Sequence, residues 1–303
     1  MSELVPIPAA LFQLAGQPPF PVLDEQGGDI AATLGGAQPA ERMVYVAGEQ
    51  LPDLRVHLLR CVPRVAGNLQ VEAYLRAWML YNVLTFEVAA LFENRELPGN
   101  AGNSRNLLEV TRAVGREGAL WAASGQVPSY RHRHLVGETF SSVAHAVNTA
   151  LYSATIAAAS GEENYEALQG VALAAVFADI ALDEEDNERS RIDKATILMR
   201  RFGVPSVGAV AGVLARYAHW DGSGTPRLAG QGIPFEGRCI AITADYDILV
   251  TGGGGESART PYEALSVMSE RHGTYDPMYL RYFVRLIARM RVQDDESSLA
   301  AAS

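Results

Sequence analysis

Three short clusters in the sequence carry side chains that can bind metals or phosphates. The segment Arg131–His134 reads RHRH, but residues two apart point to different sides of a helix, which favours a solvated linker. The four carboxylates of Asp183–Asp186 lack the alternation and the glycine of an EF-hand loop, which favours a solvated surface. The glycines of Thr251–Ser257 precede no Lys-Ser/Thr pair, so they support a phosphate-binding loop only weakly. None of these clusters predicts a function by itself.

The most specific stretch of the sequence runs from His219 to Val250 and reads HWDGSGTPRLAGQGIPFEGRCIAITADYDILV. A Gly-Ser-Gly-Thr-Pro turn is followed by Ile-Pro and then by an apolar run that ends in Ala-Asp-Tyr-Asp. In order and spacing this stretch resembles the signature of the HD-GYP family. The segments FSSVAHAVNTALYSATIAAASG, ALAAVFADIAL, GVPSVGAVAGVL and RTPYEALSVMSERHGTYDP extend the resemblance, which covers the chain from near Phe140 to near Ile287.

The resemblance implies a site at which two or three metal ions orient cyclic di-GMP and activate a bridging hydroxide. The family's first ligand histidine falls on His145, its His-Asp pair on Ala178 and Asp179, and its late ligand aspartate on Asp245. One histidine and two carboxylates of the family's ligand set are therefore retained.

The other positions of that set hold residues of different types. The histidine of the family's His-Pro segment, its double histidine, its glutamate and its lysine fall on Val204, Arg216, Tyr217, Ala218 and Leu182. Since even residues around the ligands change metal affinity or activity by about 10–100-fold, we expect no hydrolytic centre, no catalytic residue and no bound cofactor. The alternative is a metal-dependent phosphodiesterase or phosphohydrolase in which His145, Asp179 and Asp245 hold a single Mn, Fe or Mg ion.

Arg216 is the most informative of these replacements. A permanently charged guanidinium stands where the family's imidazoles approach the metals, and it can neutralise the carboxylates of Asp179 and Asp245. Its alternative role is to clamp a phosphate in bidentate geometry, together with Arg227 or Arg259.

The turn at Gly224-Thr225-Pro226 replaces the Gly-Tyr-Pro of the family and keeps the two residues that shape the loop. With Asp221 and Arg259 it supplies the other candidate contacts to a phosphate or a partner. The resemblance therefore predicts a catalytically degenerate signalling protein of a cyclic di-GMP pathway. We expect it to bind a signalling protein of the GGDEF-domain type, a cyclic dinucleotide, or both, and a homodimer is left open.

The elements that must position these residues are mainly helices. Glycine-rich punctuation between Phe20 and Val46 predicts short strands, and apolar residues at helical spacing predict helices over 69–92, from 104 to about 125, over 140–159 and over 165–182. We predict a small β-containing module at 1–60, a connecting helical region at 61–134 and a degenerate HD-GYP-like helical bundle at 135–303. Pro98, Gly99 and Gly102 are expected to separate the first two helices.

Composition excludes several classes of function. A net charge of −10 opposes binding of nucleic acid or of an anionic membrane surface. No run reaches the roughly 20 apolar residues that span a bilayer, so no membrane insertion is expected. Cys61 and Cys239 lie in no paired motif, which is typical of a reducing compartment. We therefore expect a soluble bacterial protein of the cytoplasm.

Overall fold

A computed structural model describes residues 4–34, 42–93, 101–124, 141–180, 187–204, 206–255 and 257–301. Arg131–His134, Asp183–Asp186 and Leu182 lie outside the described residues, as does the predicted boundary at 134. The structure is predominantly helical and has one two-stranded sheet in the described part, which confirms the predicted fold class.

The N-terminal module contains that sheet. Strand β1 (Leu4–Pro8) pairs antiparallel with β2 (Met43–Ala47), with Leu4 opposite Ala47 and Pro8 opposite Met43. The chain between them forms α1 (Ala10–Ala15) and the short turn η1 (Ala31–Thr33), and η2 (Gly48–Gln50), α2 (Leu51–Leu59) and α3 (Val62–Val65) follow β2. The predicted strand region thus contains β2, whereas β1 lies upstream of it.

Two long helices connect this module to the rest of the chain. They are α4 (Ala73–Glu93) and α5 (Ala101–Ser124), so Gly102 lies inside a helix and not in the predicted break. Among the described helices, α4 alone is long and apolar enough to cross a membrane, but 78% of its apolar window is buried inside the fold. That burial is typical of a core helix.

The remaining helices form the bundle that carries the candidate site. They are α6 (Ser142–Ala159), α7 (Tyr165–Ala178), α8 (Glu188–Arg201), α9 (Val207–Leu214), η3 (Gly230–Gly232), α10 (Phe235–Thr251), η4 (Gly253–Gly255), α11 (Pro261–Glu270) and α12 (Pro277–Ala301). Their beginnings are specified locally, because the side chains of Ser141, Asn164, Asn187 and Ser206 each accept a hydrogen bond from a backbone N–H of the first turn.

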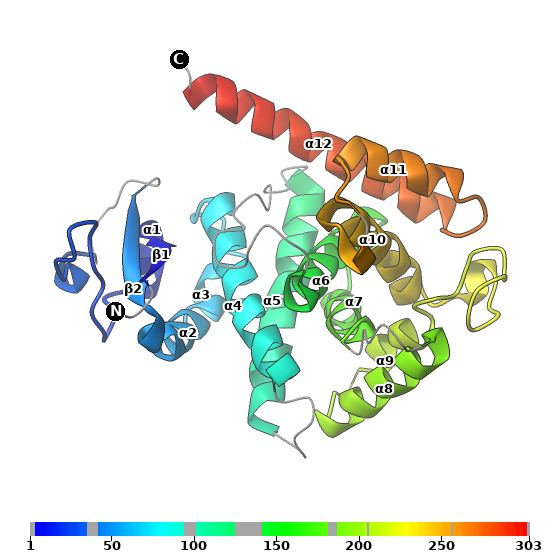
Figure 1. Ribbon diagram of the computed structural model, residues 1–303, viewed down its shortest axis with the longest axis horizontal. Helices are drawn as coiled ribbons and strands as arrows, with labels where there is room; N and C mark the ends of the chain where they lie inside the picture. Colours follow the sequence, from blue (N-terminus) through cyan, green and yellow to red (C-terminus); the bar gives the residue numbers. More distant parts are fainter. Residues whose placement is uncertain are drawn as a thin grey trace.

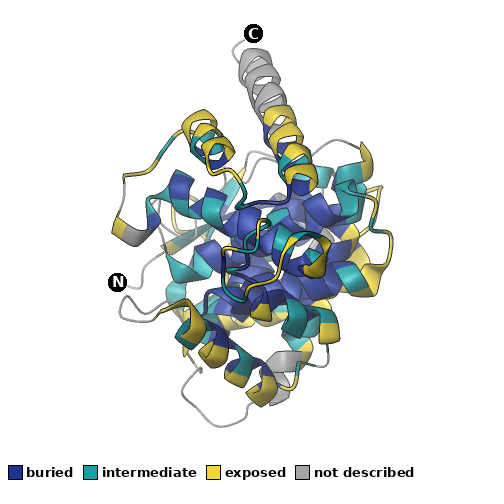
Figure 2. Ribbon diagram, turned by 90° about the vertical axis from the view of Figure 1, so that its right-hand side faces the viewer, coloured by how far each residue is buried: buried dark blue, intermediate teal, exposed yellow. Residues whose placement is uncertain are grey.

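The core is centred on α6 and α7, and α5, α9 and α10 pack around them. Buried residues gather in the middle of the molecule, and exposed residues lie toward its edges (Figure 2). Small residues allow close helix contacts: a Cβ added to Gly118 of α5 would lie 3.1 Å from the backbone carbon of Ala154 in α6. One hydrophobic cluster extends from Ile7 in β1 to Ile287 in α12. The connecting helices therefore share a core with the bundle.

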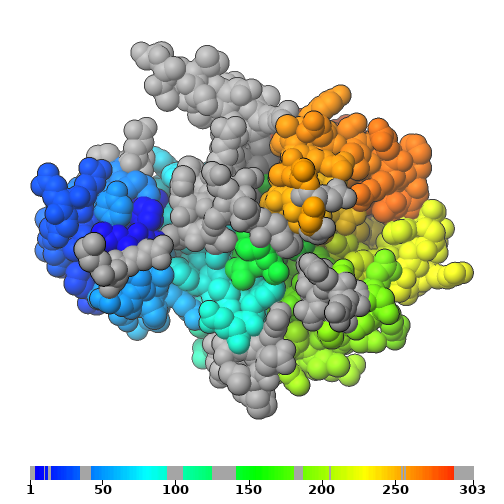
Figure 3. Space-filling model, viewed as in Figure 1, coloured from blue at the N-terminus to red at the C-terminus, as the bar shows by residue number. Residues whose placement is uncertain are grey.

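The chain runs along the long axis of the molecule (Figure 1). The N-terminal sheet lies at one end, α4 to α7 occupy the middle, and the loop between α9 and α10 lies at the other end. The space-filling view shows the same order of colours, with residues near 50 and near 225 at opposite ends (Figure 3). The candidate site lies within the bundle that begins at α6, away from the N-terminal sheet.

Candidate functional site

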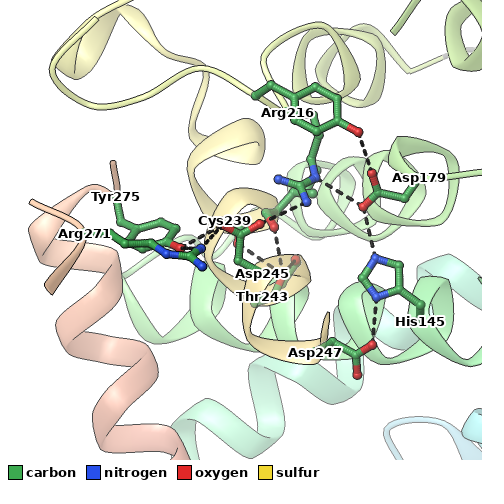
Figure 4. A network of polar contacts seen from close by, with 12 residues as sticks. His145, Asp179, Arg216, Cys239, Thr243, Asp245, Asp247, Arg271 and Tyr275 are labelled. Atoms are coloured by element: carbon green, nitrogen blue, oxygen red, sulfur yellow. Dashed lines mark hydrogen bonds and ion pairs between the residues drawn. The ribbon is translucent and has the colours of Figure 1, made fainter. Parts of the chain in front are cut away.

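The site is a chain of charged and polar side chains brought together by five segments of the bundle (Figure 4). His145 lies in the first turns of α6, and Asp179 caps the C-terminus of α7. The other members are Arg216 after α9, Asp245 and Asp247 on α10, Arg271 after α11 and Tyr275 before α12. Residues 130 positions apart in sequence thus meet at one place.

His145 is buried between two carboxylates. Its Nδ1 lies 2.7 Å from Oδ2 of Asp247, and its Nε2 lies 3.1 Å from Oδ2 of Asp179. Burial by itself lowers the pKa of the imidazole, but the hydrogen bonds and charges of Asp179 and Asp247 outweigh it and raise the pKa to about 9. At neutral pH His145 is therefore an imidazolium that donates a hydrogen bond from each ring nitrogen.

Asp179 accepts hydrogen bonds from three different side chains. Besides His145, Nε of Arg216 donates to Oδ2 at 3.2 Å, and the hydroxyl of Tyr217 donates to Oδ1 at 3.0 Å. Burial opposes ionisation of this carboxyl, yet the charge of Arg216 and the His145 contact hold its pKa well below its usual range. Asp179 is thus a carboxylate whose charge is fully compensated by its neighbours.

Arg216 links Asp179 to the outer part of the site. Arg216 is 5% exposed, and its Nη2 donates to Oδ1 of Asp245 at 3.3 Å. The guanidinium carbon also lies 4.9 Å from the ring centroid of Tyr217. Burial disfavours the charge, but the two carboxylates outweigh it and raise the pKa of Arg216. The arginine is positioned from three sides.

The outer end of the site is closed at Asp245. Tyr275 donates its hydroxyl hydrogen to Oδ2 of Asp245 at 2.7 Å, and Arg271 donates to the same oxygen at 3.3 Å. The burial of Tyr275 and the nearby charge of Asp245 raise the pKa of this phenol, which keeps it a donor. These contacts join the segment between α11 and α12 to α10.

Charges balance across the whole network. The carboxylates Asp179, Asp245 and Asp247 face the imidazolium of His145 and the guanidinium groups of Arg216 and Arg271. Within these described contacts, three carboxylates therefore face three positively charged side chains of the chain itself. Because buried carboxylates are costly unless they are paired, this pairing accounts for their retention inside the bundle.

These side chains do not fit a metal centre of the kind that the family implies. Both ring nitrogens of His145 face carboxylate oxygens, and because these carboxylates raise the pKa of the imidazole to about 9, the ring at neutral pH has no lone pair to offer to a metal. Asp245 does not join His145 and Asp179, because Arg216 lies between them. Among the residues that the structure describes, no group of three or more His, Cys, Asp or Glu side chains is placed to hold a metal ion. The geometry thus opposes the single-ion alternative.

Four members of the network were not singled out from the sequence. Asp247 is the second aspartate of the Ala-Asp-Tyr-Asp run, and Asn148, one helical turn after His145, donates to its Oδ1 at 2.8 Å. The position of Asp247 in that run was a usable signal. Arg271 and Tyr275 had no comparable signal, because only the tertiary fold brings their segment to α10.

The turn at Gly224 lies directly beside the network. The amide of Thr225 donates to the carbonyl of Tyr217 at 2.8 Å. A Cβ on Gly224 would lie 2.3 Å from that carbonyl oxygen and 2.4 Å from the amide nitrogen of His219. Only glycine permits this approach, and Pro226 follows in a cis peptide bond. The retained loop shape therefore places Tyr217 over Asp179.

The other candidate residues lie outside the network. Asp221 is exposed and accepts from the amide of Ser223 in the same loop, and Arg227 is exposed. The backbone N–H of Arg259 donates to the carbonyl of Leu249 after α10. His219 contacts Ser223 through Nδ1 at 3.0 Å, within the same loop. The second arginine beside Asp245 is therefore Arg271.

Comparison with known proteins agrees with this architecture. The model of the HD domain family matches residues 183–279, which include Arg216, Asp245 and Asp247. Among solved structures, the chain is similar to Bd1817, an HDG"Y"P protein from Bdellovibrio bacteriovorus, with a TM-score of 0.60 and 12% sequence identity over 94% of this chain and 100% of that chain. No curated protein sequence matches the chain significantly.

The family match concerns one segment of the sequence, whereas the structural match concerns the fold of nearly the whole chain. The family match identifies the segment that runs from before α8 to the start of α12, and the structural match, at 12% identity, concerns the fold. Both agree with the resemblance that the motif at 219–250 predicts. Residues 183–279 match the HD domain family, and the chain has the fold of an HD-GYP-type protein.

Proposed function

We propose that this chain is a catalytically degenerate HD-GYP-like signalling protein that acts by binding a protein partner in a cyclic di-GMP pathway of a bacterial cytoplasm. The position of Arg216 carries the proposal. Its guanidinium lies within 3.3 Å of carboxylate oxygens of both Asp179 and Asp245, the two aspartates that the family resemblance assigns to metal binding. A cation supplied by the chain thus takes over the charge compensation of metal ions.

The same contacts favour a protein partner over a nucleotide at this site. Arg216 is 5% exposed, and two of its nitrogens already donate to carboxylates. A phosphate would have to displace Asp179 or Asp245 and so deprive that carboxylate of its guanidinium partner. Arg271 is exposed and donates to Asp245. Metal-free binding of a cyclic dinucleotide is therefore the second outcome that the experiments below separate.

The decisive measurement is elemental analysis of the purified protein, combined with hydrolysis of cyclic di-GMP and of bis(p-nitrophenyl) phosphate with added Mn. We expect substoichiometric metal and no turnover, both in the natural protein and in Arg216→His, which restores one imidazole. Stoichiometric Mn or Fe together with turnover that Asp179→Ala abolishes would establish the enzyme instead.

Calorimetric titration with cyclic di-GMP in the presence of a chelator separates the two binding modes. We expect no heat of binding up to high micromolar concentration. Binding that Arg271→Gln weakens, while the exposed α8 variant Arg189→Gln leaves it unchanged, would identify a nucleotide sensor and contradict the protein-partner version.

A further inference from the structure

The outer face of α5 presents a row of exposed arginines. Arg105, Arg112 and Arg116 lie at helical positions i, i+7 and i+11 and therefore share one side of the helix. None of their side chains makes a hydrogen bond or ion pair with a residue of the described part of the chain. In a chain with a net charge of −10, three cations without carboxylate partners are an unusual local excess of positive charge.

A hollow of about 400 Å³ lies beside this row, between α3 and α5. The three arginines line it together with one carboxylate, Glu109. The rest of its lining is apolar and consists of Val62, Pro63, Ala66, Leu108 and Ala113. The surface thus combines an apolar floor with a positive border, which suits a partner that is itself both apolar and acidic.

The spacing of the arginines discriminates between small and extended anions. With a rise of 1.5 Å per residue, the backbone positions of Arg105 and Arg116 are about 16 Å apart along the helix, and Arg112 lies between them. A single phosphate group is contacted by donors within about 3 Å of its oxygens, so it reaches one part of the row. An extended partner with several carboxylates matches the whole row.

The other side of α5 is less suited to such a partner. Leu108 and Arg112 also line a second hollow of about 480 Å³, which reaches α7, α9 and the start of α10. That hollow contains the carboxylates of Glu166 and Glu236, and Glu236 is 6% exposed. Like charges there repel an acidic ligand. The α3 side of the row is therefore the side that an acidic segment would occupy.

We propose that the groove between α3 and α5 binds an acidic amphipathic segment of a partner protein, with its carboxylates on Arg105, Arg112 and Arg116 and its apolar side chains in the hollow. This surface is separate from the network around Arg216. It specifies where a partner binds, so it rests on the proposed binding function. Its test measures peptide affinity and neither metal content nor hydrolysis. Failure of this proposal can therefore be distinguished from failure of the proposed function.

The test is selection from a library of random peptides about 16 residues long, which as helices would span the row, displayed on phage against the folded full chain. We expect the selected peptides to be enriched in Asp, Glu and apolar residues. Their affinity for R105E/R112E/R116E should fall at least about 100-fold, because like charges then face each other. The neutral triple variant R105Q/R112Q/R116Q should bind with intermediate affinity.

The matched control is a second row of exposed arginines on α12, changed in R281E/R285E/R289E. This variant alters the net charge by the same amount but leaves the α3–α5 hollow intact, and peptide affinity should remain within about 3-fold. The proposal would be overturned if the selected peptides had no acidic excess, or if they bound R105E/R112E/R116E and R281E/R285E/R289E equally well. Displacement of the peptides by inorganic pyrophosphate at micromolar concentration would also overturn it. Circular dichroism of every variant establishes that it is folded.

Discussion

His145 and Asp247 are joined at 2.7 Å between Nδ1 and Oδ2, and this contact fastens the start of α6 to the second half of α10. Both side chains are almost completely buried. The other ring nitrogen of His145 contacts Asp179 at the end of α7, so one protonated histidine links α6, α7 and α10. In a metal site the same ring would present a lone pair; here it presents protons.

Asp247→Asn should therefore lower the pKa of His145. The substitution removes the negative charge at the closer of the two ring contacts, so the value of about 9 should fall toward the ordinary value of 6.5. NMR titration of the imidazole in the folded protein measures this directly. The control is Asp245→Asn, because Asp245 contacts Arg216 and not His145. An equal effect of both variants would contradict the assigned geometry.

The stability of the protein should depend on pH through His145. A pKa near 9 in the folded chain, against 6.5 in the unfolded chain, corresponds to about 3 kcal/mol of stabilisation. Because the folded pKa is the higher one, this contribution is fully present below pH 6.5 and is lost as the pH rises through 9. The free energy of unfolding from urea titrations should decrease over that interval.

His145→Gln provides the comparison for that pH dependence. Glutamine keeps hydrogen-bonding atoms but cannot carry the proton, so the variant should be less stable at pH 6 and should show a flatter dependence between pH 6.5 and 9. Burial raises the pKa of Cys239 well above its usual range, which adds a loss of stability at higher pH in both proteins. The difference between the two curves isolates His145, and parallel curves would show that it is neutral in the folded state.

Arg216→Ala should destabilise the protein by about 3–5 kcal/mol, because it removes the guanidinium that pairs with the buried Asp179 and leaves only the imidazolium of His145 to balance this carboxylate. Arg216→Lys should recover part of the loss, since an ammonium group keeps the charge without the fork that reaches two carboxylates. Urea unfolding at pH 7 measures both changes.

Arg189→Ala is the matched control for the arginine deletion. Arg189 pairs with Asp193 at 3.3 Å on the surface of α8, where the two side chains are 73% and 55% exposed. Removal of that pair should change the free energy of unfolding by less than about 1 kcal/mol. Comparable losses for Arg216→Ala and Arg189→Ala would mean that Arg216 compensates no buried charge.

How much of this site could be predicted depends on how local each signal is. His145, Asp179, Asp245 and Arg216 belong to motifs with fixed spacing, so their registration identified the elements that meet. Asp247 lay in the same run, but the aspartate that contacts the histidine was not distinguishable from its neighbour Asp245. Helix orientation in three dimensions decides that choice.

The misses in the fold have a similar cause. Strand β1 carries two prolines within five residues and becomes a strand only because β2 pairs with it across 38 intervening residues of sequence, from Pro6 opposite Tyr45. Gly102, predicted to help interrupt the connecting helices, lies inside α5. The two bundle helices predicted over 140–159 and 165–182 correspond to α6 and α7, because apolar spacing and capping residues are local signals.

The turn beside the network provides the last prediction. Gly224→Ala places a methyl group 2.3 Å from the carbonyl oxygen of Tyr217, a backbone atom that cannot move without shifting the loop. We expect a loss of about 1–3 kcal/mol in the free energy of unfolding, as for other overpacked positions. Displacement of Tyr217 should also weaken its hydrogen bond to Asp179, which tyrosine fluorescence or NMR of the Tyr217 ring would register.

Gly232→Ala is the control for this substitution. Gly232 lies in the same loop, in η3, and an added Cβ would meet no atom within 4 Å. Its stability should stay within about 0.5 kcal/mol of the natural protein. If Gly224→Ala left the free energy of unfolding equally unchanged, the loop could form without the close contact between residue 224 and the backbone of Tyr217. The preserved glycine would then not explain how the turn supports the charge network at Arg216.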